Sequence, residues 1–586
     1  MRHFFGTVLG TVVGIFAFFF VSFLILMAFG VVAGISASFK PKTNHVLYLD
    51  LRKSMLDHDA GASLFSEPAP SVVKTVRALN KAKTDKTIQG LFIRADSFGM
   101  APASAEELRL AVLDFKDSGK FVISHSQGFE SPSILPYQAI SASDEIWLQD
   151  TSGFAVAGLR SETDFYGGVF EKFEAKPQFE QFHEYKNAAN RYLETGFTDA
   201  HREATTSYLT SIFDNAVSQI AEDRALDVAA VTRILQSAPH SAESAKEMGM
   251  VDKLGHLETA REYVRKKAGG DSIKFKPIAS YSVTGKLTGD AIAFIGGQGA
   301  VLPGKSSGNS PFSRNVTMGG DTVAAGFDAA IKDKNVKAIV FRVSSPGGSP
   351  SASDQILAAA DRAREAGKPV VISMGQYAAS GGYYVSAHAD HIVALPQTIT
   401  GSIGVLGGKV ALEDTFAKVG YNVDGITIGG DYAGVYSGDT PFSESQRKAY
   451  RGQLQDIYDD FTTRVANGRD LPLERVLEIA KGRVWTGEQA KEIGLVDELG
   501  GFMTALAAAK RLGGMDEDAN VRIKVFPRKK TQQEQLQEIL SGTAEMQADI
   551  AALREITELP EVQAVLRARQ ASQLGQELKA DIASIK

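Results

Sequence analysis

Two stretches of the chain, 245 residues apart, have closely similar sequences. Residues 241–255 read SAESAKEMGMVDKLG, and residues 486–500 read TGEQAKEIGLVDELG. A second pair keeps the same order, because GLFIR at 90–94 matches AIVFR at 338–342. Order preserved over about 200 residues indicates two related domains, since solenoid repeats have periods of only about 20–50 residues.

Each half alternates apolar, β-rich runs with helical patterns. In the second half, an apolar run at 337–343 precedes a helical pattern at 353–366, and a second apolar run follows at 370–374. A long helical pattern at 197–224 recurs at 442–469. Apolar strands joined by helices predict a largely parallel sheet covered by helices. The fold class is therefore predicted as α/β, built from tandem duplicated domains.

The N-terminal segment predicts attachment to a membrane. No charged residue occurs from Phe4 to Phe39. About 20 apolar residues span a bilayer, whereas the apolar region of a cleavable signal peptide usually has only about 7–15. We therefore expect a retained transmembrane helix, although the small residues at 36–38 leave cleavage open. No second span is predicted, so the remaining chain should lie on one side of the membrane.

The composition changes again near the C-terminus. Residues 529–586 contain no aromatic side chain and are rich in Ala, Gln, Glu and Leu, which is typical of amphipathic helices. Pro560 predicts a break between them. The expected parts are a membrane anchor at 1–43, a first domain at 44–275, a second domain at 276–526 and a helical tail at 527–586.

Charge and cysteine content exclude several function classes. The net charge is −6, and no basic patch is interleaved with aromatic residues, which argues against nucleic-acid binding. The chain has no Cys, which excludes disulfides, thiol nucleophiles and thiolate metal sites. The sequence predicts no metal and no cofactor.

Ser380 lies where the pattern predicts a sharp turn between a strand and a helix. It follows the β-like run at 369–374 and precedes a predicted helix at 383–389. A Ser at such a turn is the arrangement of a nucleophile elbow. Gly381 would place a bare N–H beside the hydroxyl at the helix N-terminus, where negative charge is favoured. An ordinary Ser N-cap gives the same local pattern, so the assignment depends on other residues.

Two further motifs of the second half support chemistry at Ser380. The motif SSPGGS at 344–349 follows an apolar strand, and the N–H of Gly347 or Gly348 together with that of Gly381 would form an oxyanion hole. Ser402, in the Gly-rich segment 401–408 that we expect to be a loop, offers a hydroxyl that could hold a neighbouring base.

No histidine near Ser380 is a good candidate for the base. A Ser nucleophile normally uses His. His388 and His391 follow Ser380 by only 8 and 11 residues, on the helix and turn that Ser380 begins. Side chains at such positions seldom reach back to the hydroxyl, so a histidine base is not expected.

These motifs in combination resemble those of the signal peptide peptidase A (protease IV) family of bacterial serine peptidases. The resemblance rests on SPGG, AASGGYY, TGSIG and the repeated AKE-x-G-x-VD box, and it covers roughly residues 44–525. It is specific to the long form with two tandem domains. It implies the Clp/crotonase-like fold and a Ser/Lys dyad in place of a histidine.

The resemblance points to Lys186 as the base. Short family members have the lysine in the same domain as the Ser, but here no Lys or Arg occurs between Lys418 and Arg447. The first half instead contains HEYKNAA at 183–189, which fits the long-form lysine motif. The first half also lacks the elbow, because its equivalent region, 130–136, contains Pro132 and Pro136. The first half has therefore kept the lysine and lost the Ser elbow, and the second half has kept the elbow and lost the lysine. This complementary loss indicates a site composed of residues from both halves.

A lysine base imposes a physical condition. Its amine must be neutral, although the ordinary pKa is about 10.4, and reaching a pKa near 7–8 destabilises the ammonium by about 4 kcal/mol. Burial can supply this, whereas a carboxylate partner would oppose it. We therefore expect Lys186 to be buried between the domains, with Ser380 and Ser402 as hydroxyl partners and with Glu184 pointing away.

The predicted function is a membrane-anchored serine endopeptidase that degrades remnant signal peptides and other apolar peptides. The resemblance further implies a bacterial inner membrane location, periplasmic catalytic domains and a homotetramer. Two alternatives remain open at this stage. One is a crotonase-type acyl-CoA enzyme, and the other is a membrane-tethered scaffold.

Overall fold

The computed structural model describes residues 44–53, 55–59, 71–95, 99–283, 288–307, 316–516, 519–528 and 534. The expected anchor at 1–43 lies outside these residues, as does nearly all of the expected tail. Within the described ranges, no helix has the length and apolar character needed to cross a bilayer.

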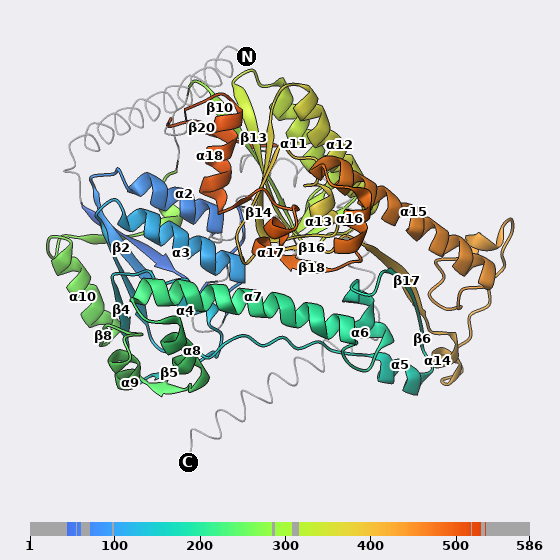
Figure 1. Cartoon of the computed structure of the whole chain (residues 1–586), viewed down its shortest axis with the longest axis horizontal. Helices are drawn as coiled ribbons and strands as arrows, with labels where there is room; N and C mark the ends of the chain where they lie inside the picture. Colours follow the sequence, from blue (N-terminus) through green and yellow to red (C-terminus); the bar gives the residue numbers. More distant parts are fainter. Residues whose placement is uncertain are drawn as a thin grey trace, which may run out of the picture.

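Two sheets with the same strand order form the framework (Figure 1). The first sheet has the order β8-β4-β3-β2-β1-β9, and all of its paired strands are parallel. Its strands are β1 (His45–Asp50), β2 (Ile88–Arg94), β3 (Phe121–Ser126), β4 (Glu145–Leu148), β8 (Lys253–Leu254) and β9 (Lys274–Pro277). The predicted parallel α/β architecture is confirmed for this half.

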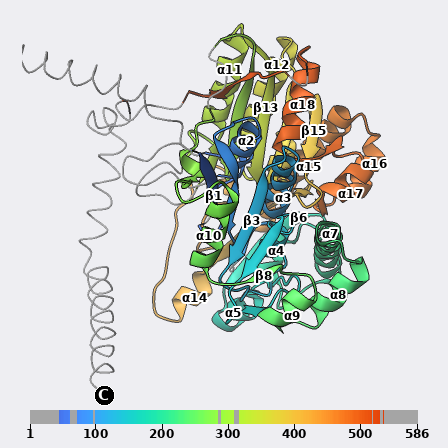
Figure 2. The same cartoon turned by 90° about the vertical axis from the view of Figure 1, so that its left-hand side faces the viewer.

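The second sheet repeats this order as β19-β15-β14-β13-β10-β20, again with parallel pairing. These strands are β10 (Ala291–Gln298), β13 (Val336–Ser345), β14 (Val370–Ala379), β15 (His391–Ala394), β19 (Glu498–Leu499) and β20 (Arg522–Phe526). Two further strands, β16 (Ile399–Gly401) and β18 (Val484–Thr486), extend it from β14, with β18 antiparallel to β16. In the side view most of the first half lies below the strands and helices β13, α11 and α12 of the second half (Figure 2).

Helices cover both sheets, as expected for apolar parallel strands. The first sheet is packed by α2 (Val72–Ala82), α3 (Pro102–Lys116) and α10 (Leu257–Lys267), and the second by α11 (Gly320–Lys332), α12 (Pro350–Glu365) and α18 (Phe502–Leu512). The predicted long helices are confirmed as α7 (Asp199–Arg224) and α15 (Glu444–Arg469). Each has a hydroxyl N-cap, from Thr198 and Ser443 respectively, that accepts a backbone N–H of the first turn.

The two halves are joined by a strand pair. Strand β6 (Lys176–Phe182) of the first half runs antiparallel to β17 (Val405–Ala411) of the second, at the right of Figure 1. The loop predicted over 401–408 is therefore confirmed only for residues 402–404, because Gly401 ends β16 and residues 405–408 belong to β17. The glycines of that segment suggested a loop, whereas a partner strand more than 200 residues earlier in the chain holds it extended.

A buried ionic cluster also joins the halves. Arg342 of β13, only 1% exposed, donates to Asp57 and Glu107 of the first half, with Nη2–oxygen distances of 2.6 Å to each. Burial alone would raise the pKa of Asp57, but the Arg342 guanidinium holds it well below its ordinary value. Removing one partner of such a pair leaves an uncompensated buried charge, so the cluster fixes how the halves sit against each other.

Candidate active site

Ser380 occupies a strained turn directly after β14. That strand extends to Ala379, five residues beyond the apolar run, and Ser380 then adopts φ 53° and ψ −121°. Positive φ is uncommon for a residue with a side chain and is typical of functional turns. The backbone holds the turn from both sides, because Ser380 N–H donates to Gly401 O at 2.8 Å and the Ser380 carbonyl accepts from Tyr383 N–H at 2.9 Å.

The helix that follows Ser380 is shorter than predicted. Helix α13 comprises only Gly381–Tyr384, and the next residues form turns before β15 begins at His391. The predicted helix at 383–389 is therefore wrong in extent, because the chain must reverse quickly to enter β15. The elbow itself needs only the first turn, because the unpaired N–H groups of a helix lie at its N-terminus.

The glycines of the SPGG motif pass close to this elbow. A Cβ on Gly347 would lie 2.7 Å from Ser380 Cβ and from Gly381 N, so only glycine fits there. The Gly347 N–H itself already donates to Ser345 Oγ at 3.1 Å. The N–H groups of Gly348 and Gly381 have no acceptor among the described residues. Gly348 and Gly381 thus remain the candidate oxyanion donors, whereas Gly347 permits the close approach.

Lys186 reaches Ser380 from the other half of the chain. It follows β6, and its Nζ lies 3.0 Å from Ser380 Oγ, 2.9 Å from Ser402 Oγ and 2.7 Å from Ser402 O. The residue is 6% exposed. Glu184 points elsewhere, toward Lys481 Nζ at 3.5 Å. The structure therefore brings together Lys186, Ser380 and Ser402, the three side chains singled out from the sequence.

Burial changes the acid–base character of Lys186. Loss of hydration lowers the pKa of its ammonium to about 7, and no carboxylate among the described residues opposes this shift. The surrounding oxygens are hydroxyls and a carbonyl, which are neutral. A lysine in this environment is partly deprotonated near neutral pH and can accept a proton from a hydroxyl.

Ser402 is held in its own strained conformation. It follows β16 with φ 49°, and its N–H donates to Arg483 O at 2.7 Å. This bond fixes the segment between β16 and β17, so that both the carbonyl and the hydroxyl of Ser402 face the Lys186 amine. Ser402 thus orients the amine without adding charge.

Sequence reasoning missed Gly482, which lies against the backbone of Lys186. Its φ is 80°, and a Cβ there would lie 2.5 Å from Lys186 Cβ and 2.7 Å from Lys186 N. The Gly482 N–H donates to Ile403 O at 2.8 Å. The repeat contained a signal for it, because Ser237 occupies the corresponding place in the first half, 245 residues earlier. Only the half that packs on the lysine has glycine at this position.

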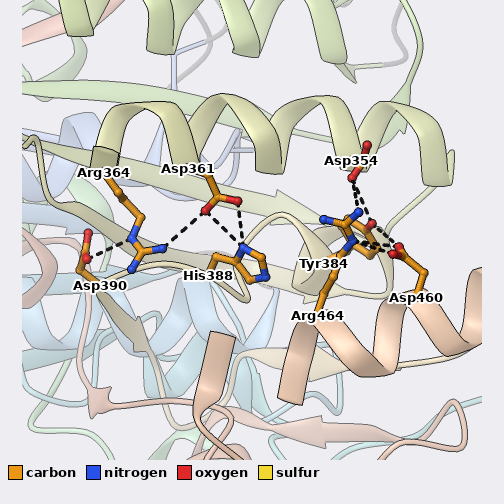
Figure 3. A network of polar contacts seen from close by, with 8 residues as sticks. All are labelled: Asp354, Asp361, Arg364, Tyr384, His388, Asp390, Asp460 and Arg464. Atoms are coloured by element: carbon orange, nitrogen blue, oxygen red, sulfur yellow. Dashed lines mark hydrogen bonds and ion pairs between the residues drawn. The ribbon is translucent and has the colours of Figure 1, made fainter. Parts of the chain in front are cut away.

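The two nearby histidines have other partners, in agreement with the expectation that neither is the base. His388 Nδ1 lies 2.9 Å from Asp361 Oδ2 (Figure 3), and His391 Nε2 lies 2.9 Å from Glu498 Oε2. Asp361 and Arg364 both belong to α12, and the Asp361 carboxylate contacts both Arg364 and His388 (Figure 3). Both imidazoles are therefore structural.

A cavity of about 430 Å³ opens beside the Ser380 hydroxyl. Its walls are mostly apolar and come from both halves: Ala188, Tyr384, Val405, Leu406, Ile457, Phe461 and Val484. Tyr384 of α13 donates to Asp460 of α15 at 2.7 Å, while Arg464 bridges Asp460 and Asp354 (Figure 3). These contacts tie the elbow helix to α12 and α15. The cavity can hold an apolar side chain of a substrate next to the nucleophile.

Within the described part of the chain, Glu106 is a second buried group near this region whose pKa is shifted to about 7. It lies on α3, is 1% exposed, and burial raises its pKa to about 7. Its carboxyl accepts from Gln397 N–H at 3.0 Å and from the Gln219 amide at 2.7 Å. Gln397 immediately precedes the segment that contains β16 and Ser402, so Glu106 belongs to the contact between the halves and not to the cavity.

Both halves of the chain are similar to known sequences. The model of peptidase family S49 matches residues 115–270 and 362–516, one match in each half. Protease 4 of Salmonella typhi is 31% identical over 506 residues, covering 82% of this chain and 77% of that protein. The chloroplastic serine protease SPPA of Arabidopsis thaliana is 28% identical over 472 residues, covering 79% and 68% respectively.

Among solved structures, a ClpP1 variant from Listeria monocytogenes matches 36% of this chain and 94% of its own length. The sequence identity is 14% and the TM-score is 0.24.

Proposed function

This chain belongs to peptidase family S49 and is a serine peptidase, and we propose that Ser380 is its nucleophile and Lys186 its general base. The contact that carries this proposal is the 3.0 Å separation between Lys186 Nζ and Ser380 Oγ, formed between two halves that each lack the other group. A buried amine with a pKa of about 7 is suited to this role at neutral pH.

The proposed reaction follows the usual course of acyl transfer. Neutral Lys186 takes the proton of the Ser380 hydroxyl while Oγ attacks the peptide carbonyl. The N–H groups of Gly348 and Gly381 stabilise the resulting oxyanion. Lys186 then gives the proton to the departing amine, which leaves an acyl-enzyme on Ser380. Water, deprotonated by Lys186, releases the carboxylic acid and restores the serine.

Labelling with a serine-reactive fluorophosphonate probe tests this assignment. Wild type should be labelled at Ser380, Ser380→Ala should not be labelled, and Lys186→Ala should react far more slowly with an unchanged thermal unfolding midpoint. Hydrolysis of a fluorogenic peptide should be lost in both variants. Full labelling of Lys186→Ala, or unchanged hydrolysis by either variant, would contradict the dyad.

The proposed substrates are apolar peptides, including remnant signal peptides after their release into the membrane. The apolar walls of the cavity support this preference, because a charged side chain placed there would lose its hydration without a partner. Cleavage of a peptide library should therefore favour apolar residues at the position before the scissile bond. Equal cleavage of peptides with Asp or Lys at that position would contradict the proposed substrate class.

We also propose that the enzyme is anchored in the bacterial inner membrane, with its catalytic domains in the periplasm, and that it assembles as a homotetramer. The apolar run from Phe4 to Phe39 supports the anchor. Large exposed apolar side chains near the end of the β6–β17 pair, such as Val419 at 79% exposure, support a contact with another copy. Alkaline extraction of membranes tests the anchor, because a chain without residues 1–43 should be released and the full chain should not.

A further inference from the structure

The repeat assigns a counterpart in the other half to each of the two strands that join the halves. In this region the offset is 246 residues, since α5 (Gly167–Phe173) and α14 (Glu413–Ala417) begin 246 residues apart. Each helix is followed by a residue of positive φ at the same offset, Glu174 at 57° and Gly420 at 76°. By this offset, β6 corresponds to residues 422–428 and β17 corresponds to residues 159–165.

Residues 422–428 do not pair with any described strand, although their counterpart does. All seven are exposed, and none of their backbone N–H or C=O groups has a hydrogen-bond partner within the described part of the chain. Ile426 is 94% exposed and Ile428 is 90% exposed. These two positions correspond to Glu180 and Phe182, which are the two buried residues of β6. Two isoleucines thus lie in solvent where the related strand is covered.

Residues 159–165 are unpaired in the same way. They form no strand, and within the described chain their backbone groups make no hydrogen bond to one another or to any other segment. Their counterpart β17 makes seven register pairs with β6, from Val405 opposite Phe182 to Ala411 opposite Lys176. The chain therefore has two unpaired segments, one in each half, whose counterparts pair with each other.

We propose that residues 422–428 of one copy pair antiparallel with residues 159–165 of a second copy. The internal pair β6–β17 fixes the register, so that Leu159 lies opposite Ile428 and Phe165 lies opposite Asn422. The contact satisfies the free backbone groups of both segments and covers Ile426 and Ile428. It rests on the homo-oligomer proposed above and names its contact, and it is independent of the catalytic dyad.

This contact is heterologous, because the second half of one copy meets the first half of the next. Such contacts repeat from copy to copy and either close into a ring or continue as a filament. In a ring, contacts within a chain and contacts between chains would alternate. The contact between chains would carry no dyad, because Tyr432 and its neighbours replace Lys186 and the first half has no elbow.

Cysteine cross-linking tests the register directly, because the natural chain contains no Cys. Four single variants are needed: R160C, T163C, D424C and T427C. Opposed residues of an antiparallel pair have Cα atoms about 4.5–5.5 Å apart, which suits a disulfide. The register predicts cross-links when R160C is mixed with T427C, and when T163C is mixed with D424C. The crossed mixtures, R160C with D424C and T163C with T427C, are out of register by three residues and serve as matched controls.

The expected result is a two-chain species on non-reducing gels from the two in-register mixtures, with little from the crossed mixtures or from any single variant alone. Equal cross-linking in the crossed mixtures would overturn the proposal. No cross-link in any mixture, with light scattering still showing an oligomer, would overturn this contact but leave the oligomer standing. A monomeric wild type would overturn both. Peptide hydrolysis on the same samples reports separately on the dyad.

Substitution of the exposed isoleucines gives a second test. The double variant I426D/I428D places two carboxylates in the proposed contact, and it should reduce the oligomer to monomers while the thermal unfolding midpoint stays unchanged. Val228 of α8 (Val228–Gln236), which is 53% exposed, provides the matched control V228D, and its mass should stay that of wild type. An unchanged mass for I426D/I428D would contradict the contact.

Discussion

The two halves of this protein share a strand order but have kept different parts of one chemical site. The second half has the strained Ser380 turn and the glycine loop beside it, whereas the first half has prolines in the corresponding region, at 130–136. The first half supplies Lys186, and the second has no lysine in the corresponding region. Duplication thus allows each copy of a domain to lose half of a site, provided that the contact between the copies is preserved.

A second pair of equivalent residues shows what that contact requires. Arg94 and Arg342 occupy the same place in the two sheets, 248 residues apart. Arg342 binds two carboxylates of the other half, while the hydrogen bond of Arg94 among the described residues goes to the Gln127 amide oxygen at 2.7 Å. The arginine that lies between the halves is therefore the one that belongs to an ionic cluster joining them.

The largest expected effect comes from removing the side chains of Ser380 and Lys186. Because the two side chains act as one unit, Ser380→Ala, Lys186→Ala and the double variant should lose similar amounts of kcat/KM, about 10⁴-fold or more in each. Steady-state hydrolysis of a fluorogenic peptide measures this. A double variant that loses the product of the two single losses would mean that the halves contribute independently.

Gly482→Ala should have the next largest effect. A Cβ at this position would lie 2.5 Å from Lys186 Cβ and 2.6 Å from Lys186 Cα, and alanine is also strained at φ 80°, so the lysine must move. We expect a loss of about 10²-fold in kcat, because a displacement of 1 Å can cost that much. The control is Gly304→Ala, at φ 84° with open space around it, which should lose stability but not activity. Equal kcat values for the two variants would contradict the packing role of Gly482.

Ser402→Ala should have a smaller effect, because it removes one oxygen near the amine and leaves the Ser402 carbonyl in place. We expect a 10- to 100-fold loss in kcat, because a hydrogen bond to a charged group contributes about 1.5–3 kcal/mol. Thr, which retains the hydroxyl, should recover part of the activity. A Ser402→Thr variant as poor as Ser402→Ala would argue that shape and not the hydroxyl matters.

The smallest expected change concerns the pH profile. Lys186 must be neutral to act, so kcat/KM should fall tenfold per pH unit below a pH of about 7 and level off above it. Glu106, whose pKa is also about 7, is the competing explanation for this fall in kcat/KM, the acid limb of the pH profile. The variant Glu106→Gln should keep the limb at the same pH if Lys186 causes it. If the fall in kcat/KM at acid pH disappears in Glu106→Gln, the titrating group is Glu106, at the contact between the halves.

Much of the architecture could be predicted from the sequence, because it depends on local patterns. The repeat, the parallel α/β fold, the long helices and the turn at Ser380 all follow from periodicity and from glycine positions within short windows. The length of the helix after Ser380 could not be predicted, because the connection to β15 determines where α13 ends.

Features that join the halves were harder to predict. The pairing of β17 with β6 depends on a partner far away in the chain, so its glycines suggested a loop. Gly482 has no motif of its own, and its role follows only from the position of Lys186. The hydrogen bond from the Gly347 N–H to Ser345 Oγ depends on the detailed path of the loop. In each case the missing information was a contact in space and not a residue preference.

Chemical rescue at position 186 tests the composite site most directly. Because the chain has no other Cys, the variant Lys186→Cys can be alkylated with bromoethylamine at a single place to give S-aminoethylcysteine, a close analogue of lysine. The sulfur makes this amine less basic than lysine. We predict that Lys186→Cys is inactive, that alkylation restores peptide hydrolysis, and that the acid limb of the restored enzyme lies at lower pH than in wild type. An alkylated enzyme that stays inactive while correctly folded, or one with an unmoved acid limb, would contradict the role of Lys186 as the base for Ser380.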